Sequence, residues 1–243
     1  MHLLEGVKFV AQVKSKKRVA DHGEVFTAER EVKAMCDLVE QECLRIDSRF
    51  LEPACGDGNF LAEILGRKLS IVKERYRRSS YDWERNALLA LGSLYGVDIL
   101  SDNCEACRER LMKIWDKAYK SVCKKECNDE TRRAARYILQ QNIVCGNALT
   151  LRCVDIQQQD TQEPIVFSEW TFPQNNAFIH RKDYTFAELL DEKPKKASAA
   201  QQTLFDADAA TDTDGEGKFI KEYVCHYRQL GAESDNEQLE LTI

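Results

Sequence analysis

The stretch Phe50-Leu51-Glu52-Pro53-Ala54-Cys55-Gly56-Asp57-Gly58-Asn59-Phe60-Leu61 determines the expected fold. Its first residues predict a short buried strand, after which two glycines allow a tight turn and Asn59 can open a helix. The apolar residues at helical spacing in that helix are Leu61, Ile64, Leu65, Leu69 and Val72. A glycine turn before a helix N-terminus suits a nucleotide-like ligand, because the backbone can approach the ligand and offers free N–H groups. The dinucleotide fingerprint G-x-G-x-x-G is incomplete, since the third glycine is missing.

Strands and helices are expected to alternate on either side of this stretch. Hydrophobic periodicity predicts helices at residues 27–43, 83–94, 102–120 and 129–141. Short apolar runs predict further strands at residues 96–99, 142–145 and 165–167. This alternation is typical of an α/β fold, a doubly wound parallel sheet with helices on both faces.

The chain divides into a neutral body and an acidic tail. Of the 41 acidic and 35 basic residues, the segment from Asp191 onward holds 12 and 6, which leaves 29 of each in residues 1–190. We expect one domain over 1–190, a disordered acidic linker at 191–218, and a tail at 219–243 that docks back on the body. Gross charge therefore gives no support for nucleic-acid binding.

The composition excludes several classes of protein. No apolar run reaches the ~20 residues of a membrane helix, and no secretory signal follows Met1. The ten cysteines are therefore expected to be reduced, in a cytoplasmic protein. Two pairs, Cys104-x2-Cys107 and Cys123-x3-Cys127, have spacing that can hold zinc, but a helix with buried cysteines is the alternative, and we expect no metal.

The stretch at 50–61 closely resembles the S-adenosylmethionine-binding motif of bacterial DNA adenine-N6 methyltransferases from restriction–modification systems. The resemblance implies a class I methyltransferase (Rossmann-like) fold. It also implies that the loop Ala54–Gly58 contacts the methionine part of the cofactor and that Phe60 packs beside it. The cofactor-binding residues expected in this stretch are Glu52, Ala54, Cys55, Gly56, Gly58 and Phe60.

Three further elements match the family in order. Gly23-Glu24-Val25-Phe26-Thr27-Ala28 is similar to G-x-[FV]-[FY]-T-P, which implies that Phe26 and Thr27 meet the methionine end. Gly96-Val97-Asp98-Ile99 looks like the strand whose acidic end binds the ribose hydroxyls, and an ionised carboxylate suits a diol because it only accepts hydrogen bonds. Gly146-Asn147-Ala148-Leu149 resembles G-[DN]-A-L, whose polar residue meets the adenine. The expected contacts are Phe26, Thr27, Asp98, Ile99, Asn147 and Ala148.

The catalytic motif of the family, [NDS]-P-P-[YFW], is missing, because the chain has no Pro-Pro pair. At the expected place stands Pro164-Ile165-Val166-Phe167-Ser168-Glu169-Trp170. Ser168 could accept a hydrogen bond from the adenine and Trp170 could stack on it, whereas Glu169 replaces a proline. The alternative is a plain strand end with a core aromatic residue.

Partners follow from these resemblances and from short motifs. DNA is the expected substrate, with a companion or specificity subunit as partner. Two basic clusters could meet phosphates or be solvated faces: Lys14, Lys16, Lys17 and Arg18, and Lys68, Lys73, Arg75, Arg77 and Arg78. Gln201-Gln202-Thr203-Leu204-Phe205 resembles the Q-x-x-L-F peptide that docks on the bacterial sliding clamp through Gln201, Leu204 and Phe205, or is a chance apolar pair.

Three functions follow from this sequence. The first is an S-adenosylmethionine-dependent DNA adenine-N6 methyltransferase. The second is a non-catalytic cofactor-binding subunit that relies on a partner for the catalytic motif. The third is a clamp-associated DNA interaction protein.

Overall fold

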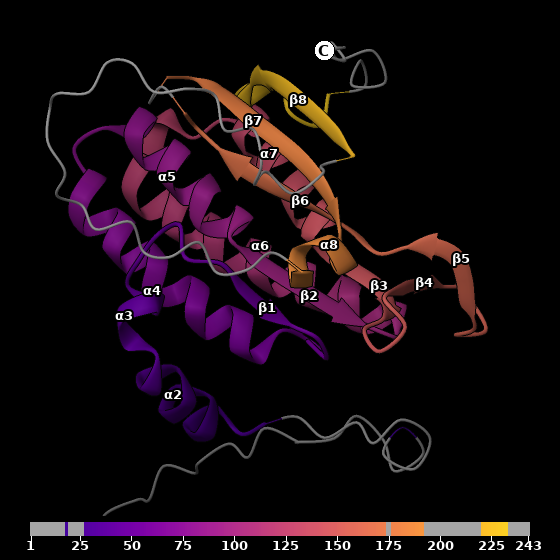
Figure 1. The fold of residues 1–243 in the computed structure, drawn as a ribbon. Helices are drawn as coiled ribbons and strands as arrows, with labels where there is room; N and C mark the ends of the chain where they lie inside the picture. The colour runs from indigo at the N-terminus through magenta and orange to yellow at the C-terminus, as the bar shows by residue number, and fades with distance from the viewer. Residues whose placement is uncertain (1–17, 19–26, 174–175, 192–219, 233–243) are drawn as a thin grey trace, which may run out of the picture.

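The computed structural model describes residue 18 and residues 27–173, 176–191 and 220–232 (Figure 1). The helices are α2 (Glu29–Leu38), α3 (Glu40–Cys43), α4 (Asn59–Tyr76), α5 (Ser80–Gly92), α6 (Ser101–Cys123), α7 (Asp129–Asn142), α8 (Phe186–Asp191) and the 3₁₀ turns η1 (Lys124–Glu126) and η2 (Tyr227–Gln229). The strands are β1 (Phe50–Glu52), β2 (Leu94–Asp98), β3 (Ile143–Asn147), β4 (Arg152–Val154), β5 (Asp160–Pro164), β6 (Val166–Thr171), β7 (Phe178–Thr185) and β8 (Lys221–His226). None of the described helices has the length and apolar character needed to cross a membrane.

The main sheet is mixed, with the strand order β1-β2-β3-β4-β5. β1, β2 and β3 run parallel, as the alternation of strands and helices predicts, whereas β4 and β5 form an antiparallel hairpin on the β3 edge. This hairpin extends away from the body in Figure 1. The prediction of a fully parallel sheet is therefore wrong beyond β3.

The expected fourth strand does not join this sheet. The run 165–167 enters β6, which belongs to a separate antiparallel sheet of order β6-β7-β8. The physical reason is that β6 and β7 pair along six residues, from Val166 opposite Thr185 to Thr171 opposite His180. An apolar run of three residues predicts a buried strand but not the strand it pairs with.

The two faces of the main sheet are covered differently. Successive side chains of β2 point to opposite faces, so its residues show what covers each one. Leu94 belongs to the large core that α4, α5, α6 and α7 share, and these helices pack against one another (Figure 1). Tyr95 and Val97 belong to a smaller core with Ile165, Phe167 and Phe186. On this second face the short helix α8 and the start of β6 stand where full-length helices were expected. The protein is of the α/β class.

The expected helix at 27–43 is divided at Val39, whose φ of −120° and ψ of 32° leave the helical region. The buried residues of α2 are Val32 and Cys36, one turn apart, so they form the contact with α4. The apolar spacing of Val32, Met35, Cys36, Leu38 and Val39 favours one buried stripe along this segment, and that expectation is wrong in part, because Met35, Leu38 and Val39 are exposed.

The C-terminal segment packs on the body over residues 220–232. β8 pairs with β7 along its whole length, and Tyr227 and Leu230 are buried in the large core. The buried carboxylate of Glu84 in α5 accepts hydrogen bonds from the Tyr227 hydroxyl at 2.5 Å and from Arg228 Nη2 at 2.9 Å. Almost all of the expected linker at 191–218 lies outside the described residues.

Candidate ligand-binding site

A cavity of about 490 Å³ lies where the three parallel strands end. Glu52, Asp98 and Asn147 are the last residues of β1, β2 and β3, so their side chains meet at one edge of the sheet. Ligands of open α/β sheets bind at this carboxyl edge. The lining comprises Thr27, Glu52, Pro53, Ala54, Cys55, Gly56, Asn59, Phe60, Asp98, Ile99, Leu100, Asn103, Gly146, Asn147, Ala148 and Leu149.

Glycines shape the loop between β1 and α4. Gly56 has a φ of +52° and Gly58, the N-cap of α4, a φ of +86°, so both adopt backbone conformations that favour glycine. The loop is tied to the sheet because the Cys55 N–H donates to the Val97 carbonyl at 2.8 Å. A Cβ on Gly58 would lie 2.6 Å from Cys107 Sγ, so α6 leaves no room for a side chain there.

Gly58→Ala is therefore expected to destabilise the protein by about 1–3 kcal/mol through backbone strain and this clash. Gly66→Ala is the matched control, because Gly66 lies inside α4 with nothing within 4 Å of a built Cβ. There alanine is expected to stabilise the protein by up to about 1 kcal/mol. Urea denaturation measures both effects, and equal stability of the two variants would contradict this description of the loop.

The Asp98 carboxylate joins the two loops at the site. Its Oδ2 accepts from the Gly56 N–H at 2.9 Å, and its Oδ1 accepts from the Leu100 N–H at 2.9 Å. Asn103 Nδ2 donates to the same Oδ1 at 3.2 Å. Asp98 thereby fixes the relative position of the glycine loop and the start of α6.

The charge of the cavity favours a cationic ligand. The described lining includes two carboxylates, Glu52 and Asp98, and no basic side chain. Burial raises the pKa of the Glu52 carboxyl above its ordinary value of 4.5, as expected for a carboxylate partly removed from water. A positive charge on a bound ligand would lower the pKa of Glu52 again, because it stabilises the carboxylate. The diphosphate of a dinucleotide would instead be repelled.

Two hydrogen bonds orient the side-chain amide of Asn147, which lines the cavity at the end of β3. Its Nδ2 donates to Asp160 Oδ1 at 3.0 Å, and its Oδ1 accepts from the Leu149 N–H at 3.0 Å. One N–H and one lone pair of this amide remain for a ligand. Phe60, Ile99 and Ala148 are among the apolar residues that line the cavity.

Most of the expected cofactor residues come together in this cavity. Thr27, Glu52, Ala54, Cys55, Gly56, Phe60, Asp98, Ile99, Asn147 and Ala148 line it. Gly58 shapes the loop without lining the cavity, and Phe26 lies outside the described residues. Sequence reasoning did not assign two polar lining residues, Asn59 and Asn103, to the cofactor site. The position of Asn103 in the first turn of α6, five residues after Asp98, was the available signal.

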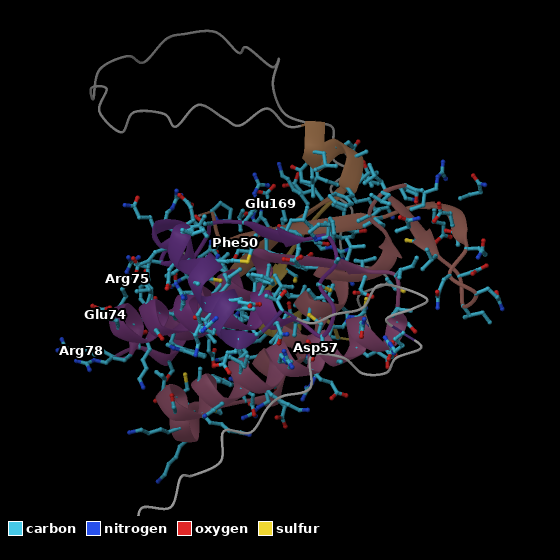
Figure 2. All side chains as sticks on the ribbon, turned by 90° about the horizontal axis from the view of Figure 1, so that it is seen from below. Phe50, Asp57, Glu74, Arg75, Arg78 and Glu169 are labelled. Carbon is cyan, nitrogen blue, oxygen red and sulfur yellow. The ribbon has the colours of Figure 1, made fainter. Side chains whose placement is uncertain are left out.

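Ser168 and Trp170, the expected catalytic pair, do not line this cavity. Ser168 is 1% exposed, donates from Oγ to Asp183 Oδ1 at 2.6 Å and accepts from Arg181 Nε at 2.9 Å. Trp170 is 5% exposed and packs so closely on Gly92 that a Cβ there would lie 2.8 Å from the indole ring. Glu169 forms an ion pair with Arg49 at 3.6 Å, beside β1 (Figure 2). These positions fit the alternative of a strand end with a core aromatic residue.

Six of the ten cysteines are buried and four are half-buried. Cys104, Cys107 and Cys123 are buried along α6, and all ten cysteines are free thiols in the described part of the chain. Burial raises the pKa of Cys123 to about 12, so this thiol is protonated at neutral pH. Among the described residues no group of three or more His, Cys, Asp or Glu side chains could hold a metal ion.

In the basic cluster Lys68–Arg78 the structure buries Lys68 and leaves Arg75, Arg77 and Arg78 exposed, which fits the alternative of a solvated face for these arginines. Lys68 is fully buried, and desolvation lowers its pKa to about 8 while Nζ donates to the Ile46 carbonyl and Ser93 Oγ. A phosphate contact by Lys68 is therefore ruled out. Arg75 and Arg78 are exposed and point away from the body near the end of α4, far from Asp57 (Figure 2).

In the N-terminal cluster only Arg18 is described. It forms an ion pair with Asp102 in α6, with Nη1 2.6 Å from Oδ2. The other basic residues of this cluster, Lys14, Lys16 and Lys17, lie outside the described residues.

Comparisons with models of known protein families, with curated proteins and with solved structures find no match to this chain.

Proposed function

We propose that the chain binds S-adenosylmethionine in the cavity at the ends of β1, β2 and β3, as the cofactor-binding component of a DNA adenine-N6 methylation system. The observation that carries the proposal is the convergence of Glu52, Asp98 and Asn147 on one cavity. Each comes from a separate motif of the sequence that resembles the adenine-N6 methyltransferases. S-adenosylmethionine supplies an activated methyl group when bound.

The residues of the cavity fit this cofactor. A volume of about 490 Å³ lies within the ~300–1,000 Å³ of small-molecule sites. The two carboxylates complement the sulfonium and ammonium charges of the ligand. Asp98 offers an acceptor for a ribose hydroxyl and Asn147 a donor and an acceptor for the adenine edge. The Cys55–Gly58 loop presents backbone beside the methionine part.

The affinity for S-adenosylmethionine is expected to fall as the pH drops toward the raised pKa of Glu52, because the protonated carboxyl no longer attracts the cationic ligand. Glu52→Gln is expected to bind about tenfold more weakly at neutral pH and to show a flatter pH profile. Calorimetric titrations of both proteins between pH 7.5 and 5 measure this. The same pH dependence in both proteins would exclude Glu52 as the cation partner.

The catalytic step is proposed to depend on a partner subunit. Methyl transfer to adenine needs acceptors for the amino group and an aromatic face for the extruded base. Ser168 and Trp170 are both buried, and neither is among the residues that line the cavity. We therefore favour the cofactor-binding subunit over an independently active enzyme.

The isolated chain is expected to transfer methyl groups to DNA at background rate, at least ~10²-fold below the rate with the partner. Tritiated S-adenosylmethionine and varied genomic DNA, with and without subunits encoded next to this chain, provide the test. Robust turnover by the chain alone, lost in Ser168→Ala or Trp170→Ala variants that still bind the cofactor, would contradict the proposal.

The remaining partners are proposals from the sequence alone. DNA, a companion methylase or specificity subunit and a restriction–modification setting in the cytoplasm rest on the resemblance. The clamp peptide with Gln201, Leu204 and Phe205 lies outside the described residues.

A further inference from the structure

The acceptor capacity of Asp98 can be counted from its contacts. A carboxylate has about four lone-pair sites on its two oxygens. Three are occupied by donors from the described residues: Leu100 N–H and Asn103 Nδ2 on Oδ1, and Gly56 N–H on Oδ2. One site, on Oδ2, is left for a ligand.

Two of these donors are backbone groups that cannot rotate away. The Gly56 N–H belongs to the loop tied to β2 through the Cys55–Val97 hydrogen bond, and the Leu100 N–H lies at the N-cap of α6. Releasing either one would require the loop to move. The third donor belongs to a side chain, that of Asn103, so a substitution can remove it.

Arg18 determines which way the Asn103 amide faces. Arg18 Nη2 donates to Asn103 Oδ1 at 3.2 Å, while its guanidinium is held by Asp102. An arginine can only donate, so the amide must present its oxygen to Arg18 and its nitrogen to Asp98. Asn103 is 1% exposed, which leaves little space for another rotamer.

We propose that Asp98 accepts one ribose hydroxyl of the bound nucleoside and not both, and that Asn103 sets this limit as a positioning residue. This inference rests on the proposed function. It makes the site selective for a nucleoside with a hydroxyl at one ribose position and tolerant of its loss at the other.

The test is calorimetric titration of the full chain with S-adenosylhomocysteine and with its 2′-deoxy and 3′-deoxy forms. One deoxy analogue is expected to bind about tenfold more weakly than the parent, because a hydrogen bond to a charged acceptor is lost. The other is expected to bind within about threefold of the parent. The unmodified protein provides this result, so the test does not depend on a variant that folds.

In Asn103→Ala a second lone pair is freed on Asp98, so both analogues are expected to bind about tenfold more weakly than the parent ligand. If both deoxy analogues bind the unmodified protein equally more weakly than the parent, the claim that Asp98 accepts only one ribose hydroxyl is wrong, whereas the proposed function stands. Equal affinity of all three ligands would overturn the role of Asp98 in ribose binding. No binding of S-adenosylhomocysteine would overturn the proposed function, and this inference with it.

Discussion

Glu84→Ala is expected to destabilise the protein by about 3–5 kcal/mol and to release residues 220–232 from the body. Glu84 is fully buried, and its Oε1 accepts from the Tyr119 hydroxyl and from Asn128 Nδ2. Its Oε2 accepts from Tyr227 and Arg228. The variant leaves the buried hydroxyls of Tyr119 and Tyr227 without this acceptor, and each costs about 1–3 kcal/mol.

The matched control is Glu74→Ala. Glu74 is exposed near the end of α4 and points into solvent (Figure 2). Its loss is expected to change stability by less than about 0.5 kcal/mol. Urea denaturation gives the stability, and hydrogen exchange of Lys221–His226 reports the release of β8. Unchanged protection of β8 in Glu84→Ala would show that the carboxylate does not hold the C-terminal segment.

Asp98→Ala is expected to weaken S-adenosylmethionine binding at least ~100-fold. The ligand loses its ribose acceptor, and the Gly56 and Leu100 N–H groups lose the carboxylate that joins their loops. Asp129→Ala, an exposed carboxylate at the start of α7, is the control and is expected to leave binding unchanged. Similar affinities of the two variants would remove Asp98 from the proposed site.

Local signals predicted the half of the fold that carries the candidate site. β1, the glycine turn and α4 follow one another within 50–76, so periodicity and glycine positions suffice to identify them. Parallel strands bring their carboxyl ends together, and for this reason residues as distant as Glu52 and Asn147 could be expected at one cavity.

Pairing between distant segments could not be predicted. β5 has four polar residues before Pro164 and is mostly exposed, so no hydrophobic pattern indicates a strand. β8 is held by pairing with β7 and by Glu84, which is 143 residues from Tyr227 in sequence. Ser168 and Trp170 lie on one face of β6, and only the three-dimensional structure shows that Ser168 bonds to Asp183 and Arg181 of β7 and that Trp170 packs on Gly92.

The most direct test of the central claim is calorimetric titration of the full chain with S-adenosylmethionine at pH 7.5. We expect saturable binding at one site per chain, lost in Asp98→Ala and retained in Asp129→Ala. The absence of heat at millimolar ligand, with protein shown to be folded by circular dichroism, would contradict the assignment of this cavity to the cofactor.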